Sequence, residues 1–251
     1  MEMFKQKIRQ VLNRLGFDLV RLPRLGSDKL SHEYEPVRPS AMYAPWKKDF
    51  PFQEVFAAIR GATLVDLYRC FELWHLIGES SKLPEGDIIE IGVWRGGTGA
   101  LIAKKAALCG IPGKVFLCDT FTGVVKAGAH DASYTGGEHS DTSRTSVETF
   151  LRSRMKLENF EILEGIFPDQ TGHAIESRRF RFCHIDVDVY QSAKDIVEWI
   201  WDKLIPGGFI VFDDYGFPGC SGIAAFVDEQ MKLGDRIILH NLNGHAILIK
   251  R

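Results

Sequence analysis

The sequence predicts an α/β fold in which a mostly parallel, doubly wound sheet is followed by an antiparallel hairpin. From residue 87 onward, short apolar runs alternate with helical patterns, and runs such as IIEI and FIVF are apolar on both faces. Parallel strands that are covered by helices on both sides have this pattern. The last two runs, RIILHNL and HAILIK, are joined through Asn243 and Gly244, which is a hairpin turn signal.

Five parallel strands are expected before the hairpin. Their predicted ranges are Asp87–Ile91, Lys114–Cys118, Phe160–Leu163, Arg181–Val187 and Phe209–Phe212. A glycine-rich turn follows the first strand and leads into a helix from about Thr98 to Leu108. The helix after the fourth strand is expected to begin with a capping box of Ser192 and Asp195 and to end at residues 206–208, Pro-Gly-Gly.

The chain before the sheet is predicted to form an N-terminal arm, residues 1–50. Residues 2–15 have the spacing of an amphipathic basic helix, and the proline-containing segment 16–50 is typical of an irregular connection. We expect this helix to dock on a partner subunit or on the main domain, residues 51–251, rather than on an anionic membrane surface. A homodimer is therefore expected.

Composition favours a folded cytoplasmic protein without a nucleic-acid partner. The formal net charge of -2 provides no overall basic field for phosphate backbones. No apolar run approaches the roughly 18 residues that a membrane span needs, and the N-terminus lacks the apolar core of a signal peptide, so we expect no stable membrane insertion. The five cysteines form no CxxC pair and are interpreted as reduced thiols.

The segment IIEIGVWRGGTG, residues 88–99, has the strand, glycine turn and helix of a nucleotide-binding corner. Three residues separate Gly92 from Gly96, which departs from the dinucleotide pattern. Asp119 ends the second strand, where an acid can accept hydrogen bonds from ribose hydroxyls; the alternative is a turn or cap aspartate. Glu90 lies within a buried strand, and we expect a charged ligand or backbone amides to satisfy it.

Carboxylates follow the fourth strand in HIDVDVY and the fifth strand in IVFDDYG. Asp186 and Asp188 would point to the same side if the strand persists that far, and Asp213 and Asp214 end the neighbouring strand. Four carboxylates are therefore expected to converge at the edge where open α/β folds bind ligands. Their repulsion favours a hard cation, Mg²⁺ or Mn²⁺. The alternative is that one of the second pair only caps a turn.

Three histidines are weighed for a role in the site. His184 lies within the fourth strand and is interpreted as a buried core histidine rather than as a ligand. His130 and His139 lie in the segment 122–145, which is long enough to be a lid over a substrate. Either could assist proton transfer, and His139 is taken as the candidate. The alternative is that both are solvated loop histidines.

The segments EIGVWRGGTG, DTFTG, DVDVYQSAKD and LIPGGFIVFDDYG, in this order, resemble the macrocin O-methyltransferase family over roughly residues 55–250. The resemblance implies a Rossmann-like class I methyltransferase fold with a seven-stranded sheet whose last strand is antiparallel. It also implies an S-adenosylmethionine- and magnesium-dependent O-methyltransferase. The acceptor would be a hydroxyl of a sugar that is free, nucleotide-linked or part of a glycan or natural product.

The resemblance also implies residue roles. Asp186, Asp213 and Asp214 match the family's magnesium ligands, and Asp188 matches a proposed general base. The residues assigned to the cofactor are Glu90, Gly92, Trp94, Gly96, Gly97, Asp119, Thr120, Gly165 and Asp186. Methyl transfer requires the acceptor oxygen to be aligned and deprotonated, and a metal bound to adjacent hydroxyls could do both. We therefore expect an acceptor with vicinal hydroxyls.

Three other functions remain open at this point. Catechol offers an equivalent diol, so a catechol-type O-methyltransferase is one alternative. A D-x-D motif at a strand end also holds manganese and a sugar nucleotide in many glycosyltransferases. A non-catalytic, cofactor-binding scaffold subunit is the third. The second aspartate pair and the glycine turn favour methyl transfer.

Overall fold

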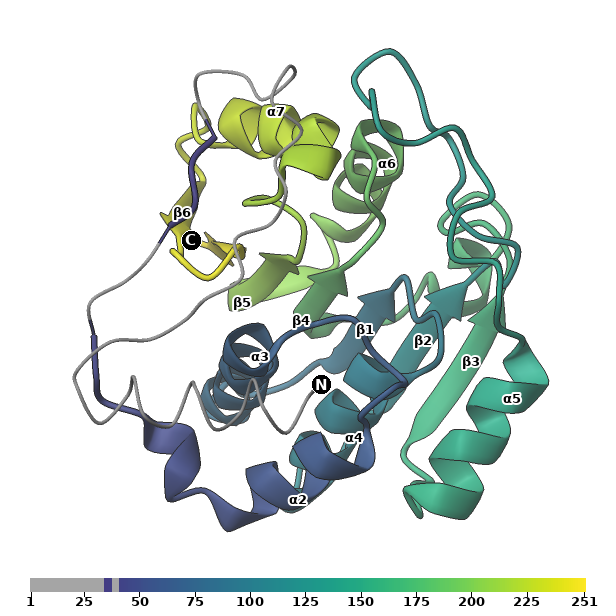
Figure 1. The fold of residues 1–251 in the computed structure, drawn as a ribbon, viewed down its shortest axis with the longest axis vertical. Coiled ribbons are helices and arrows are strands. Elements are labelled where there is room, and N and C mark those ends of the chain that lie inside the picture. Colours follow the sequence, from purple (N-terminus) through teal and green to yellow (C-terminus); the bar gives the residue numbers. More distant parts are fainter. Residues whose placement is uncertain (1–33, 38–40) are drawn as a thin grey trace, which may run out of the picture. The chain divides into compact units, whose positions relative to one another are not determined.

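One seven-stranded sheet organises the described part of the chain (Figure 1). Its strands are β1 (Asp87–Ile91), β2 (Val115–Asp119), β3 (Phe160–Glu164), β4 (Phe180–Ile185), β5 (Leu204–Phe212), β6 (Arg236–His240) and β7 (Ala246–Lys250). The strand order is β3-β2-β1-β4-β5-β7-β6; β7 pairs antiparallel with both β5 and β6, and all other pairs are parallel. The predicted fold, including the terminal hairpin, is confirmed.

This computed structural model describes residues 34–37 and 41–251. The predicted helix at residues 2–15 and most of the connecting segment lie outside the described residues. Residues Pro39–Arg251 form one compact unit, which contains the sheet and its helices. Among the described residues, none of the helices is long and apolar enough to cross a membrane. All five cysteines lie in this part and are free, as interpreted from the sequence.

Helices cover both faces of the sheet. They are α2 (Phe50–Ala58), α3 (Leu67–Ser80), α4 (Gly97–Leu108), α5 (Arg144–Thr149), α6 (Tyr190–Ile200) and α7 (Ser221–Gln230). Neighbouring strand residues enter opposite layers: Ile88 packs in a core with α2 to α5, whereas Ile89 packs in a core with α6 and α7. This arrangement explains why the strand sequences are apolar at successive positions.

Two boundaries of the parallel strands differ from the prediction by more than one residue: the end of β4 and the start of β5. β4 ends at Ile185 rather than Val187, so both aspartates that follow it lie in a turn. The Pro-Gly-Gly segment does not end a helix, because residues 206–208 lie inside β5. The pairing of β4 with β5 shifts register between Phe180 and Phe182, and this irregularity accommodates the extra residues. Periodicity alone does not reveal such a bulge.

The predicted capping box at the start of α6 is wrong. The helix begins at Tyr190, and its N-cap residue offers no side-chain cap. Instead, Oδ1 of Asp131 accepts a hydrogen bond from the Tyr190 amide at 2.9 Å. Ser192 lies inside the helix and donates to the Val125 carbonyl at 3.0 Å, while Asp195 pairs with Lys126. The loop before α5 therefore supplies the cap of α6.

Candidate active site

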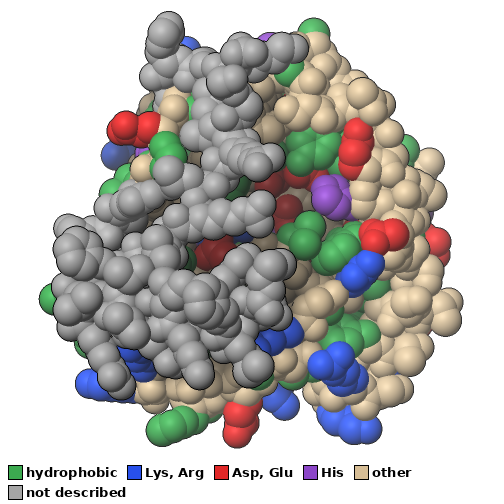
Figure 2. Space-filling model, viewed as in Figure 1, with side chains coloured by type: hydrophobic (Ala, Val, Ile, Leu, Met, Phe, Trp, Pro, Cys, Tyr) green, Lys and Arg blue, Asp and Glu red, His purple; other side chains and the backbone are tan. Residues whose placement is uncertain are grey.

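A cavity of about 420 Å³ lies at the carboxyl ends of the parallel strands, where open α/β folds bind ligands. It brings together most of the residues that the sequence singled out: Gly92, Trp94, Asp119, Thr120, His139, Gly165, Asp186, Asp188, Asp213 and Asp214. Figure 2 shows acidic side chains inside this hollow, with hydrophobic side chains beside them. Glu90, Gly96 and Gly97 are not among its lining residues.

The glycine turn is shaped by the end of the neighbouring strand. Gly92 has φ of 87°, and a Cβ atom there would lie 1.7 Å from the carbonyl oxygen of Asp186. No side chain fits in this space. Gly97 packs in the same way against the chain before α3, because its Cβ would lie 2.6 Å from the Ala62 carbonyl. These glycines serve protein packing, and a cofactor role for Gly96 and Gly97 stays a prediction.

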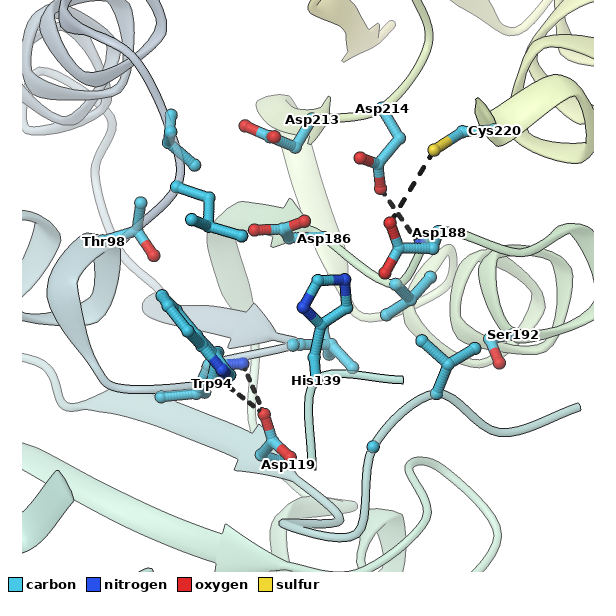
Figure 3. Close-up of a pocket in the computed structure, with 18 of the residues that line it drawn as sticks. Trp94, Thr98, Asp119, His139, Asp186, Asp188, Ser192, Asp213, Asp214 and Cys220 are labelled. Atoms are coloured by element: carbon cyan, nitrogen blue, oxygen red, sulfur yellow. Dashed lines mark hydrogen bonds between the residues drawn. The ribbon is translucent and has the colours of Figure 1, made fainter. Parts of the chain in front are cut away.

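Asp119 holds the glycine turn in place. Its Oδ2 accepts hydrogen bonds from the amides of Val93 and Trp94 at 2.7 and 2.8 Å, and its Oδ1 accepts one from Phe121 at 2.7 Å. Figure 3 shows this carboxylate below Trp94. Oδ2 already accepts two hydrogen bonds, but Oδ1 keeps a further lone pair, so the group can still accept a hydrogen bond from a ligand. The predicted turn role and ligand role are therefore compatible.

Two other predicted residues complete this end of the cavity. The Thr120 hydroxyl donates to the Gly123 carbonyl at 2.9 Å, which closes a tight turn after β2. The Gly165 amide donates to the Asp119 carbonyl at 2.9 Å, at the end of β3. Both residues line the cavity, and the side chain of Thr120 is already engaged with its own loop.

Trp94 connects the glycine turn to the loop that precedes α5. Its indole nitrogen donates to Asp141 at 2.7 Å, and the same carboxylate pairs with Arg95 at 2.5 Å. The Thr142 hydroxyl donates to the Trp94 carbonyl at 2.6 Å. The ring of His139 lies 6.3 Å from the Trp94 ring, and Figure 3 shows it between Trp94 and Asp188. His139 is exposed at the cavity rim.

Glu90 contacts a histidine rather than the expected ligand or backbone amides, and its Oε2 atom has no hydrogen-bond partner among the described residues. Its side chain is fully buried, and Oε1 lies 2.9 Å from Nδ1 of His184. Burial raises the pKa of Glu90, although the contact with His184 opposes this shift. Burial by itself lowers the pKa of His184, but the contacts with Asp213 and Glu90 raise this pKa to about 10. The interpretation of His184 as a core residue fits this burial.

Four aspartates converge on the cavity, as Figure 3 shows. Oxygen atoms of Asp186, Asp213 and Asp214 lie within 4.8 Å of one another. Asp188 is not placed by strand alternation, because β4 has already ended. Instead its backbone adopts a left-handed conformation with φ of 65°, and its amide donates to Oδ2 of Asp214 at 3.0 Å. A non-glycine residue in this region is strained, which is common at functional sites.

Electrostatics differ sharply within this cluster. Burial and the neighbouring carboxylates raise the pKa of Asp186 and of Asp214 well above the usual range. The pKa of Asp188 is also raised, and burial is the largest cause. Three carboxyl groups that resist ionisation beside a cavity fit a divalent cation, because a hard cation supplies the opposing charge and prefers oxygen ligands.

Asp213 is the exception, because Arg69 and two histidines surround it. Its Oδ1 lies 2.8 Å from Nε2 of His245, and Arg69 binds Oδ2. Burial opposes ionisation, but His184, His245 and Arg69 hold the pKa of Asp213 well below its usual range. The other nitrogen of His245 lies 2.6 Å from Glu72. Sequence reasoning missed Arg69, Glu72 and His245.

Two further residues were also missed. The Tyr134 hydroxyl donates to Oδ1 of Asp188 at 2.5 Å, and Sγ of Cys220 lies 3.7 Å from the same oxygen. Burial and the charge of Asp188 raise the pKa of Tyr134, so its hydroxyl stays protonated. Both residues lie far from Asp188 in the sequence, so no local motif identifies them.

A family model described as Macrocin-O-methyltransferase (TylF) matches residues 63–242. The chain belongs to the macrocin O-methyltransferase family. The resemblance in the four sequence segments is thus confirmed, and the matched range contains both aspartate pairs and the glycine turn. Membership in this family also supports S-adenosylmethionine as the cofactor.

Two relatives of this macrocin O-methyltransferase family member are informative. One is the 8-demethyl-8-(2,3-dimethoxy-alpha-L-rhamnosyl)-tetracenomycin-C 4'-O-methyltransferase of Streptomyces olivaceus, 30% identical over 54% of this chain and 55% of the relative. The other is the Mycinamicin III 3''-O-methyltransferase of Micromonospora griseorubida, 27% identical over 70% of this chain and 74% of the relative. The match thus spans about half the length of the first relative.

Solved structures agree on the fold of this macrocin O-methyltransferase family member. The O-methyltransferase NovP aligns with a TM-score of 0.63 and 22% identity, covering 75% of this chain and 81% of NovP. The calicheamicin methyltransferase CalS11 aligns with a TM-score of 0.62 and 15% identity, covering 88% and 99%. These likenesses establish a class I methyltransferase fold.

Proposed function

We propose that this protein is an S-adenosylmethionine- and magnesium-dependent O-methyltransferase that methylates a hydroxyl of a sugar. The observation that carries the proposal is one cavity with a glycine turn and Asp119 at one end and four aspartates at the other. The two relatives named above, by their descriptions, methylate the 4' and 3'' hydroxyls of their substrates. Sugar hydroxyls attached to a larger molecule are therefore the first acceptors to examine.

The cofactor would bind at the turn end of the cavity. A ribose hydroxyl would donate to Oδ1 of Asp119, whose carboxylate is already oriented by the amides of the turn. The amino-acid part would extend toward Asp186 at the end of β4, and Gly165 would border the adenosine. Because Gly92 locks this turn against Asp186, the two ends of the cavity are held in a fixed relation.

Asp186, Asp213 and Asp214 would hold the magnesium ion, which would orient two adjacent hydroxyls and lower the pKa of the one to be methylated. When bound, S-adenosylmethionine would supply the methyl group: the acceptor oxygen would attack the methyl carbon in line, and the electron pair of the broken carbon–sulfur bond would leave with S-adenosylhomocysteine. Asp188 takes the proton that the hydroxyl loses. His139, at the cavity rim beside Asp188, would assist this transfer.

The test is a methylation assay with radiolabelled S-adenosylmethionine over three acceptors: mycinamicin III, dTDP-L-rhamnose and catechol. We expect incorporation into at least one sugar acceptor with magnesium and its loss when EDTA is added. Turnover of catechol but of neither sugar acceptor would mean that the acceptor is of the catechol type instead of a sugar. Absence of turnover with all acceptors, or turnover that is unaffected by EDTA, would contradict the proposal.

A further inference from the structure

We propose that Tyr134 is a positioning residue that fixes the orientation of Asp188, so that one carboxylate oxygen of Asp188 faces the acceptor. The inference rests on the proposed function, because it assigns Asp188 the acceptor's proton. Tyr134 comes from the loop that precedes α5, and Asp188 comes from the turn between β4 and α6. The two residues meet at the wall of the cavity.

The contacts of Asp188 divide its two carboxylate oxygens into different roles. Oδ1 accepts the Tyr134 hydroxyl at 2.5 Å and has the Cys220 thiol 3.7 Å away. Among the described residues, no hydrogen-bond donor contacts Oδ2. Without Tyr134, the thiol, a weak donor, would be the remaining side-chain contact of this carboxylate. The tyrosine therefore decides which oxygen is free for the acceptor.

Asp131 holds both Tyr134 and the start of the helix that follows Asp188. The Tyr134 amide donates to the carbonyl of Asp131 at 3.3 Å, and the side chain of Asp131 accepts hydrogen bonds from the Gly128 and Tyr190 amides, each at 2.9 Å. Tyr190 is the first residue of α6 and follows the Asp188 turn. Because Asp131 is only 4% exposed, this anchor fixes donor and acceptor to one another.

Orientation, rather than charge, is the contribution that this contact makes. A carboxylate that accepts a hydrogen bond becomes a weaker base, so the tyrosine does not increase the basicity of Asp188. A base must lie within hydrogen-bond reach of the proton it removes, and a displacement of about 1 Å can cost up to about a hundredfold in rate. Fixing one rotamer of Asp188 therefore outweighs the loss of basicity.

The first experiment compares Tyr134→Phe with Tyr190→Phe. Each substitution removes one phenolic oxygen that is bonded to a carboxylate, but the Tyr190 hydroxyl contacts Glu229 at 2.9 Å on the outer surface. With the best sugar acceptor of the assay above, we expect Tyr134→Phe to lower kcat about tenfold and to leave KM within about twofold. Tyr190→Phe should match wild type. Equal behaviour of the two variants would overturn the inference.

The second experiment combines Tyr134→Phe with Asp188→Asn. If the tyrosine acts through Asp188, its removal should cause no further loss of kcat in the Asp188→Asn background. Independent, multiplying losses would overturn the inference while leaving the proposed function intact. S-adenosylhomocysteine affinity should be the same in wild type and Tyr134→Phe, because the hydroxyl is assigned to the acceptor end.

Crystal structures of wild type and Tyr134→Phe with S-adenosylhomocysteine give a readout that needs no turnover. We expect one orientation of the Asp188 carboxylate in wild type and a second rotamer in the variant. An unchanged, fully ordered Asp188 in the variant would overturn the inference. Absence of methylation by the wild type would instead contradict the proposed function, and these structures would still decide the role of Tyr134.

Discussion

At the scale of single residues, the neighbouring Asp213 and Asp214 have opposite effects on the stability of the folded protein when they are ionised. Asp213 is surrounded by Arg69, His184 and His245, whereas Asp214 faces other carboxylates. Ionised Asp213 therefore stabilises the folded protein, and ionised Asp214 destabilises it when the metal is absent. The identical side chains in FDDYG give no sign of this difference, because the partners of Asp213 come from α3, β4 and the hairpin.

The first prediction concerns Asp213→Asn in protein freed of metal. We expect its free energy of unfolding to fall by about 3 kcal/mol, because the buried Arg69 loses the buried one of its two carboxylate partners and keeps only the more exposed Asp66. Urea unfolding in EDTA measures this change. Asp214→Asn is the matched control and should unfold at an equal or higher urea concentration, because it removes a repelling charge. A similar destabilisation in both variants would contradict this account.

The second prediction concerns Gly92→Ala. The added Cβ would lie 1.7 Å from the Asp186 carbonyl, so the turn and the end of β4 must separate. We expect destabilisation by more than about 3 kcal/mol and loss of S-adenosylhomocysteine binding, measured by thermal unfolding and calorimetry. Gly234→Ala is the control, because nothing lies within 4 Å of its Cβ position. A normal affinity in Gly92→Ala would contradict this view of the turn.

At the scale of elements, a distant residue caps the helix that follows the aspartate turn. The sequence predicted Ser192 as a local cap, but Asp131 accepts the hydrogen bond from the first amide of α6. Local spacing predicted the strands, the glycine turn and α4 well, because their burial pattern is contained in adjacent residues. It could not predict a cap that lies 59 residues away, nor the early end of β4.

The third prediction compares Asp131→Ala with Ser192→Ala. Loss of an N-cap typically costs about 1 kcal/mol, and Asp131 also holds the loop through Gly128. We therefore expect Asp131→Ala to lower stability by about 1–2 kcal/mol and to speed hydrogen exchange over residues 124–138. Ser192→Ala should have the smaller effect on both. If Ser192→Ala proves the more damaging, the local capping box would regain support.

At the scale of the whole molecule, the two ends of the cavity depend on different parts of the chain. The end proposed for the cofactor uses β1, β2 and β3, whereas the acidic end uses β4, β5, the segment 122–145 and α3. All four aspartates were predictable from the sequence, because parallel strands end at one edge. Arg69 and Glu72 were not, because they meet residues 144 and 173 positions away.

The fourth prediction follows from this division. Removing magnesium with EDTA should abolish methyl transfer but change S-adenosylhomocysteine affinity by less than about threefold, because Asp119 and the glycine turn are formed without a metal. Calorimetry with and without EDTA measures this affinity. Parallel loss of binding and turnover would mean that the aspartates belong to the cofactor pocket.

Helix α3 has a consequence for protein engineering. Asp213 follows β5, yet its ionised state depends on Arg69 of α3. His245, which contacts Asp213, also contacts Glu72 of the same helix. A chimera that exchanged only the segment from β1 onward with a relative would join these aspartates to a foreign helix. The smallest transplantable cassette for the acidic end therefore starts before Asp66, upstream of every strand in the sheet.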